Sequence, residues 1–154
     1  MLPVMVIGAD LVFDDPQNLC FGCSPHNEHG MQVRFTHVEP SAVEGRYTAA
    51  AHVCGAPGVI HGGVQAVLLD EAIGFAIHAS DGGFDTGDEP EIAAVVTVEF
   101  NLRYRRPAPT GVELVLRGEV LRVEGRDYFA EASIRDVDGQ VLTEATARWK
   151  QLSR

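Results

Sequence analysis

The pattern of apolar and polar positions divides the chain into one helix and a series of strands. Residues 62–79 form a nearly continuous apolar run that begins with glycine and holds two carboxylates in its middle. This run predicts a helix, and a helix that is apolar on nearly all sides is normally buried. Residues 92–106 instead alternate apolar and polar side chains, which predicts a strand with one face toward the core.

Further strand-like runs flank the helix on both sides. The predicted strands cover 31–38 and 42–54 before the helix, and 92–106, 112–123, 126–137 and 140–151 after it. An Asp-Gly pair at 138–139 predicts a hairpin turn. Residues 1–30 show no sustained period and are expected to be an N-terminal lead-in segment, and 80–91 an acidic, glycine-rich loop. One helix and about six antiparallel strands predict a single α+β domain over 1–154, with the helix packed on one sheet.

The two carboxylates of the predicted helix, Asp70 and Glu71, lie where ionised groups are costly to bury. At 100° per residue, Asp70 shares a stripe with Gly63, Ala66 and Gly74, whose small side chains leave room around it. Such a stripe serves either close packing against the sheet or access to the carboxylate. Glu71 lies about 100° away, where we expect a structural contact or a solvated edge.

The separation of Gly63 and Asp70 limits what one helix can do. Seven residues span roughly 10 Å along a helix axis. A backbone N–H at the helix start can stabilise a developing oxyanion, but a carboxylate acting on the same carbonyl carbon must lie within a few ångströms of it. If both groups serve one reaction, they come from different chains. The sequence therefore predicts at least a dimer with sites shared across the interface.

Composition and charge exclude several classes of partner. The formal net charge of −10 is opposite to that of a typical nucleic-acid-binding protein, and it gives no attraction to an anionic membrane surface. Three cysteines cannot all pair and are expected to be reduced thiols of a cytoplasmic protein. The apolar start has no basic flank, so a signal peptide is not expected, and no run is apolar and long enough to predict a membrane span.

Three stretches of the chain resemble the hotdog-fold acyl-CoA thioesterases of the PaaI-like branch. "PGVIHGGVQAVLLDEAIG" is similar to the His-Gly-Gly helix of that family, with an acidic residue nine positions after the histidine. "TVEFNLRYRRPA" is similar to the strand that follows, and "NLCFGCSPHNEHGMQVRF" to an N-terminal lead-in. The resemblance implies a long central helix wrapped by a curved antiparallel sheet. It also implies homodimers or homotetramers that hydrolyse acyl-CoA thioesters with no cofactor.

The resemblance also implies roles for individual residues. Asp70 would be the nucleophile or general base, and the Gly63 N–H would polarise the thioester carbonyl. Thr97 occupies a position where the family often has Ser or Thr near the carboxylate, and His61 would orient the turn or the substrate. Gly62 would contact the substrate within the same turn. Such a site would explain why an apolar helix carries a carboxylate, because a carboxylate is tolerated in an apolar wall that lines a substrate cleft.

The basic cluster Arg103, Arg105 and Arg106 has two interpretations. Its members are either free, exposed side chains at a strand end or contacts for the phosphates of coenzyme A, for which arginine offers bidentate geometry. Strict alternation places Arg103 and Arg105 on one strand face together with Thr97.

Cysteine and histidine residues of the lead-in form the pattern C-x2-C-x2-H-x2-H. Cys20, Cys23, His26 and His29 are zinc-type ligands, but zinc fingers have a long loop between the two pairs, so no metal site is expected here. Cys54 lies seven residues before His61 and is expected to be a small buried residue rather than a nucleophile.

Two other functions remain open for the same fold. A hotdog dehydratase or hydratase needs a positioned His–acid pair, whereas His61 and Asp70 lie on opposite sides of one helix. A non-enzymatic acyl-CoA-binding protein needs no catalytic carboxylate at all. Fold alone does not separate these functions.

Overall fold

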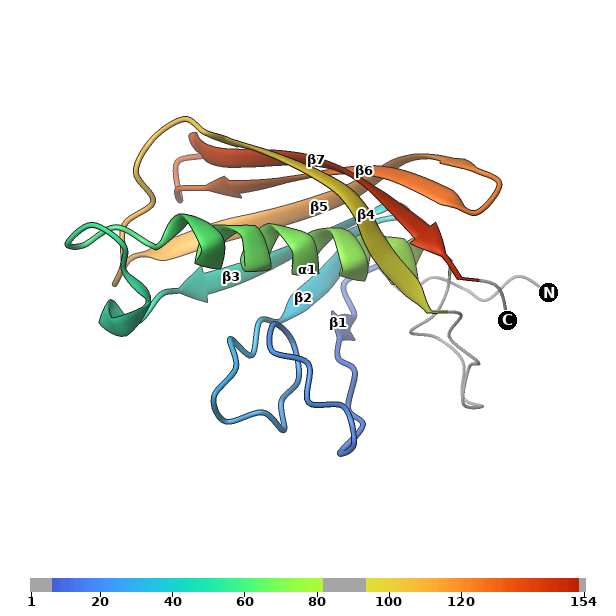
Figure 1. The fold of residues 1–154 in the computed structure, drawn as a ribbon, viewed down its shortest axis with the longest axis horizontal. Coiled ribbons are helices and arrows are strands. Elements are labelled where there is room, and N and C mark those ends of the chain that lie inside the picture. The colour runs from blue at the N-terminus through green and yellow to red at the C-terminus, as the bar shows by residue number, and fades with distance from the viewer. Residues whose placement is uncertain (1–6, 82–93, 153–154) are drawn as a thin grey trace.

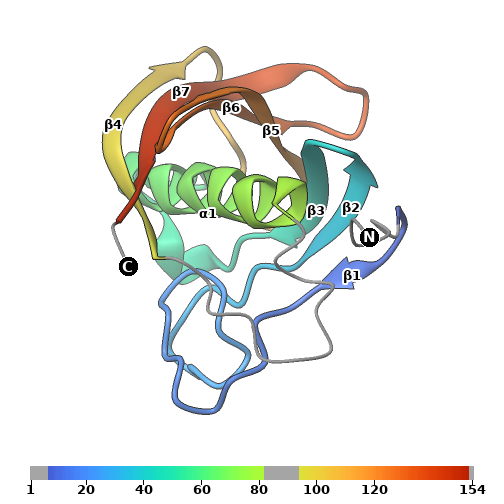
Figure 2. The same cartoon turned by 90° about the vertical axis from the view of Figure 1, so that its right-hand side faces the viewer.

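A computed structural model describes residues 7–81 and 94–152, which form one helix wrapped by one curved sheet (Figures 1 and 2). In chain order the elements are β1 (Asp10–Leu11), β2 (Phe35–Glu39), β3 (Ala42–Thr48), a short 3-10 helix (Ala51–Val53), α1 (Gly62–Ser80), β4 (Val95–Tyr104), β5 (Glu113–Glu124), β6 (Asp127–Arg135) and β7 (Val141–Gln151). The strand order is β1-β2-β3-β5-β6-β7-β4, and every neighbouring pair is antiparallel. The predicted α+β hotdog fold is confirmed, with a two-residue strand, β1, added at one edge.

The helix α1 fills the concave side of the sheet, as Figure 2 shows. Leu68, Leu69, Ala72, Ile73 and Phe75 are among its fully buried side chains. The closest approach is to β5, where a Cβ on Gly118 would lie only 2.1 Å from the Ala72 carbonyl oxygen. Glycine is therefore required at this position, because any side chain would push the helix away from the sheet.

A buried polar contact fixes α1 along its own axis. The side chain of Gln65 accepts a hydrogen bond from the Thr143 hydroxyl of β7 at 2.5 Å and donates one to the Ile60 carbonyl at 2.8 Å. Both side chains are almost fully buried. Because an unsatisfied buried amide is costly, this pair specifies one placement of the helix over the sheet.

The lead-in segment packs on the side of α1 that the sheet leaves open (Figure 2). Phe13 stacks against Phe75 and His78 of the helix with ring centroids 5.1 Å apart in both pairs. The N–H groups of Met31 and Val33 donate to the carbonyls of Phe21 and Gly22. This bonding within the lead-in is why the strand predicted over 31–38 begins only at Phe35.

Two other predicted boundaries differ from the structure. The strand predicted over 42–54 ends at Thr48, because the pairing of β3 with β5 ends at Thr48 and Glu113. The strand predicted from residue 92 is described from Val95, and the loop predicted over 80–91 lies mostly outside the described residues. Within the described ranges, the one long helix is not apolar enough along its length to cross a bilayer.

A β-bulge in β4 changes which face its residues present. Thr97 pairs with Trp149 and Glu99 with Arg148, so Val98 is an extra residue on the β4 side. Thr97 therefore faces the helix together with Phe100 and Leu102, which lie beyond the bulge. The prediction that Thr97 shares a face with Arg103 and Arg105 was wrong, because it assumed unbroken alternation.

The Gly118 contact gives a prediction about stability. Gly118→Ala should lower the free energy of unfolding by about 1–3 kcal/mol, because the added methyl group forces the helix backbone outward. Leu121→Ala, at an exposed position of the same strand, should change it by less than about 0.5 kcal/mol. Urea denaturation of both variants measures this difference, and a Gly118→Ala protein as stable as the wild type would contradict the packing described here.

Candidate active site

The N-terminus of α1 is organised by its His-Gly-Gly turn. His61 is the N-cap, and its Nδ1 accepts a hydrogen bond from the Gly63 N–H at 2.9 Å. An imidazole that accepts at Nδ1 carries its proton on Nε2 when it is neutral. This hydrogen bond gives the role predicted for His61 in orienting the turn a structural basis. The imidazole also occupies the Gly63 N–H, which was expected to bind a substrate carbonyl.

The same turn is tied to the edge of the sheet by Tyr104. The Tyr104 hydroxyl donates to the Gly62 carbonyl at 2.8 Å, and a Cβ on Gly62 would lie 3.3 Å from that hydroxyl oxygen. By the alternation predicted for residues 92–106, Tyr104 belongs to the apolar face of its strand, which gives it no role in the site. Because Tyr104 is exposed, its hydroxyl could equally have bonded to water, and no local signal in the sequence indicates its contact with the helix start.

Asp70 lies two turns further along α1 and faces β4. Its Oδ1 accepts a hydrogen bond from the Thr97 hydroxyl at 2.8 Å, so the bulge in β4 brings together two residues predicted for the site. Burial raises the pKa of Asp70, and the hydrogen bond from Thr97 partly offsets that rise. A half-buried carboxylate with a raised pKa is a stronger proton acceptor than an ordinary aspartate.

Asp70 lies beside the strand at one edge of the sheet. β4 is the last strand of the sheet, and its outer edge has no neighbour within the described residues. Val96 and Val98 beside Thr97 are 39% and 44% exposed. Apolar side chains on an exposed strand edge favour pairing with another strand.

Glu71 lies in a different environment from Asp70, although the two are adjacent in sequence. Its side chain is held under the lead-in loop, where the Cys20 thiol donates to Oε1 at 3.5 Å. Burial raises the pKa of Glu71, and hydrogen bonds from Cys23 and Cys20 partly offset this. Of the two alternatives for Glu71, a structural contact or a solvated edge, the structure shows the structural contact.

The arginine cluster lies away from the helix. Gly118 faces α1, so Arg117 and Glu119 on either side of it face outward. Arg103 lines a shallow cavity of about 270 Å³ on the same outer surface, together with these two residues. Arg105 pairs with Glu144 at 2.6 Å. The structure therefore does not bring Arg103 and Arg105 next to Asp70 within one chain, and Arg106 is exposed just beyond the end of β4.

The cysteine and histidine candidates separate in the structure. Cys20 and Cys23 lie together near Glu71, whereas His26 pairs with Asp14 at 2.7 Å. Cys54 was expected to be buried and is exposed, because it lies in a surface segment after the short 3-10 helix, where it forms an isolated bridge with Ile60.

Comparison with known proteins places the chain in a family. A family model described as "Thioesterase superfamily" matches residues 57–143. The chain therefore belongs to the thioesterase superfamily, and the predicted resemblance to hotdog-fold thioesterases is confirmed.

Individual relatives agree with this assignment. The acyl-coenzyme A thioesterase THEM4 of Bos taurus is 30% identical over 107 residues, which are 69% of this chain and 39% of that protein. The chain thus spans about two fifths of the length of this relative. A crystallised thioesterase superfamily protein is 30% identical with a TM-score of 0.74, covering 86% of this chain and 60% of that one. The Escherichia coli PaaI protein of the phenylacetic acid degradation operon shares the fold, with a TM-score of 0.67 at 14% identity over 80% of this chain and 81% of its own.

The raised pKa of Asp70 predicts a stability gain on its removal. A carboxyl whose pKa is higher in the folded chain stabilises the fold at pH values below its unfolded pKa, and this contribution is lost as the pH rises through the folded pKa. Asp70→Asn should therefore raise the melting temperature at neutral pH, and the gain should shrink as the pH falls toward the ordinary value of 3.8. Asp138→Asn, on an exposed turn, controls for the loss of one negative charge. Equal shifts in both variants at every pH would contradict the environment described for Asp70.

Proposed function

We propose that this chain hydrolyses acyl-CoA thioesters, with Asp70 as the catalytic carboxylate. The observation that supports this most directly is a half-buried aspartate on the His-Gly-Gly helix that accepts a hydrogen bond from a hydroxyl of β4, the last strand of the described sheet. Membership of the thioesterase superfamily and similarity to proteins named acyl-coenzyme A thioesterase support the same reaction.

In the proposed reaction, Asp70 acts in its ionised form. As a general base it takes a proton from water while the water oxygen attacks the thioester carbonyl carbon. As a nucleophile it attacks that carbon itself, and water then hydrolyses the resulting anhydride. In both routes the carbon–sulfur bond breaks and coenzyme A leaves as a thiolate that is then protonated. The raised pKa favours the role of base, and the Thr97 hydroxyl keeps the carboxylate oriented.

The proposed oxyanion site is the first turn of α1. The developing negative charge would lie at the positive end of the helix dipole, close to the Gly63 N–H. Because His61 Nδ1 accepts from that N–H in the free chain, the thioester oxygen has to replace the imidazole as acceptor. Tyr104 holds the Gly62 carbonyl and so keeps the turn in place during the exchange.

One chain does not supply both groups to one carbonyl, so the proposed enzyme is a homodimer or a higher oligomer. Gly63 and Asp70 are about 10 Å apart along the axis of α1. The exposed apolar residues Val96 and Val98 on the unpaired edge of β4 suit pairing with the same edge of a second copy. In such a dimer, Asp70 of one chain would act with the helix N-terminus of the other.

Coenzyme A brings several negative charges that need a partner. Arg103, Arg105 and Arg106 are proposed as contacts for its phosphates, and Arg105 would exchange its ion pair with Glu144 for this purpose. Because Arg103 and Arg105 lie on the outer surface of the sheet, away from the helix that carries Asp70, a contribution from the partner chain fits this proposal.

The first functional prediction concerns Asp70 itself. Asp70→Asn should reduce acyl-CoA hydrolysis by at least about 100-fold, the usual scale for a lost base. Glu99→Gln, which alters a carboxylate on the same edge strand that pairs with Arg148, should leave the rate close to wild type. A thiol-release assay over short, long and aryl acyl-CoAs measures this. If the wild type binds acyl-CoA tightly without hydrolysing it, the chain is a binding protein instead. If it hydrates an enoyl-CoA, it is a hydratase.

The shared site has its own test. Gly63→Val crowds the helix start, where a Cβ already lies 3.2 Å from His61 Nδ1, and Asp70→Asn removes the base. Each variant alone should be inactive. After the two are unfolded together and refolded, random pairing gives half of all dimers one intact site, which predicts about a quarter of wild-type activity. If verified heterodimers form and activity stays at the parental level, each site is built within a single chain.

A further inference from the structure

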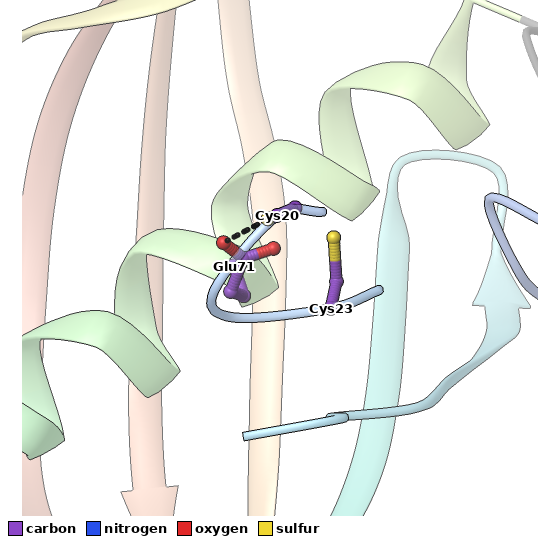
Figure 3. A group of neighbouring side chains, drawn as sticks. All are labelled: Cys20, Cys23 and Glu71. Carbon is purple, nitrogen blue, oxygen red and sulfur yellow. Dashed lines mark hydrogen bonds between the residues drawn. The ribbon is translucent and has the colours of Figure 1, made fainter. Parts of the chain in front are cut away.

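Outside the proposed active site, two thiols and a carboxylate converge beneath the lead-in loop. Figure 3 shows Glu71 on α1 and Cys20 and Cys23 on the loop that passes around it. One oxygen or sulfur atom from each of the three side chains lies within 4.8 Å of the other two. Cys23 is buried, and Cys20 and Glu71 are partly buried. The group joins residues that are 51 positions apart in the sequence.

The hydrogen bonds of Glu71 are weak for a carboxylate in this position. Its side-chain donor among the described residues is the Cys20 thiol at 3.5 Å, with the Cys23 thiol close by, and thiols donate poorly. None of the ion pairs within the described ranges includes Glu71. A buried charge is normally paired with an opposite charge or bound to a metal ion. Among the described residues, Glu71 has no such cationic partner.

The loop is built closely around this carboxylate. A Cβ on Gly22 would lie 2.3 Å from Cγ of Glu71, so only glycine allows the backbone to pass there. The loop is held by its own hydrogen bonds, from the Ser24 N–H to the Cys20 carbonyl at 3.2 Å and from the Cys20 N–H to the Asn18 side chain at 3.0 Å. The two sulfur atoms are therefore held in place rather than carried on a free segment.

We propose that Cys20, Cys23 and Glu71 bind a zinc ion. Zinc prefers thiolate, imidazole and carboxylate ligands in a tetrahedron, with Zn–S distances of about 2.3 Å. Ligand atoms in such a site lie about 4 Å apart, so the three groups need only small shifts to surround the ion. Binding forms two zinc–sulfur bonds and one zinc–oxygen bond, and the two thiol protons pass to solvent. The fourth position is open to water.

This site differs from the one considered in the sequence. The expectation of no metal weighed Cys20 and Cys23 together with His26 and His29, whereas the structure supplies a carboxylate from the helix as the third ligand. His26 is held by Asp14 instead. The site is also separate from the proposed reaction, because Asp70 faces Thr97 on β4 and Glu71 faces the lead-in. Zinc here would fasten the lead-in to α1.

Elemental analysis and cobalt substitution test this proposal. Untagged protein purified without chelators should contain about one zinc per chain. Metal-free protein titrated with Co²⁺ should develop the near-ultraviolet thiolate-to-cobalt charge-transfer band and the visible bands of a tetrahedral site. Zinc should also raise the melting temperature of the metal-free protein, since it binds the folded chain.

Matched variants distinguish this ligand set from others. Cys20→Ser and Cys23→Ser should lose the charge-transfer intensity of one sulfur each, and Glu71→Gln, which keeps both thiols and nearly the same shape, should weaken zinc binding by at least about 10-fold. Cys54→Ser, His26→Gln and His29→Gln should bind as the wild type does. Circular dichroism checks that each variant is folded. If Cys23→Ser does not fold, Glu71→Gln and Cys20→Ser still test the ligand set.

Three results would overturn the proposal. The first is protein that neither contains zinc nor develops the cobalt bands. The second is cobalt binding that survives in folded Glu71→Gln with unchanged affinity or is lost in His26→Gln. The third is a Cys20–Cys23 disulfide, found by mass spectrometry in protein isolated without oxygen.

Discussion

The fold depends on enclosing a helix that is apolar on nearly all sides. The sheet curves around α1, and the helix rests on β5 at Gly118, where the backbones are too close for any side chain. The sheet leaves one side of α1 open, and the lead-in segment packs there. Since the burial of α1 leaves it few orientations, the buried contact between Gln65 and Thr143 is enough to select one. The positions of Asp70 against β4 and of Glu71 against the lead-in segment follow from that orientation.

The elements could be predicted from the sequence largely because their hydrophobic periods are strong. The helix expected over 62–79 is α1, and the hairpin expected at 138–139 joins β6 to β7. What failed were features that depend on a partner strand. The alternation from Val96 to Tyr104 continues without a break, so nothing local indicates that Val98 is an extra residue opposite β7. Strand β1 is two residues long and exists through its pairing with β2, which leaves no period to detect.

The candidate site was predictable to the extent that it lies on one helix. Helical spacing separated Asp70 from Glu71 and indicated room around the former, and the resemblance to thioesterases supplied Thr97. Contacts across long sequence distances were not predictable. The bond from Tyr104 to Gly62 joins a strand end to a helix start, and the pairing of Cys20 with Glu71 joins the lead-in to the middle of α1. The local cysteine–histidine motif gave no indication that Glu71 lies beside Cys20 and Cys23, because that neighbourhood depends on packing rather than on spacing.

The strand order has a consequence for how the protein is made. β4 is synthesised after α1, but its sheet neighbour is β7, the last strand that the structure describes. While the chain emerges from the ribosome, β4 has no neighbouring strand and α1 lacks part of its cover. Thr97 reaches Asp70 only when β7 has been translated and paired on both sides. Such non-local pairing is slow, and it exposes apolar surface to other nascent chains. The carboxylate proposed for catalysis thus gains its hydroxyl partner only after β7 has been synthesised, and until then the uncovered apolar surface is a target for a molecular chaperone.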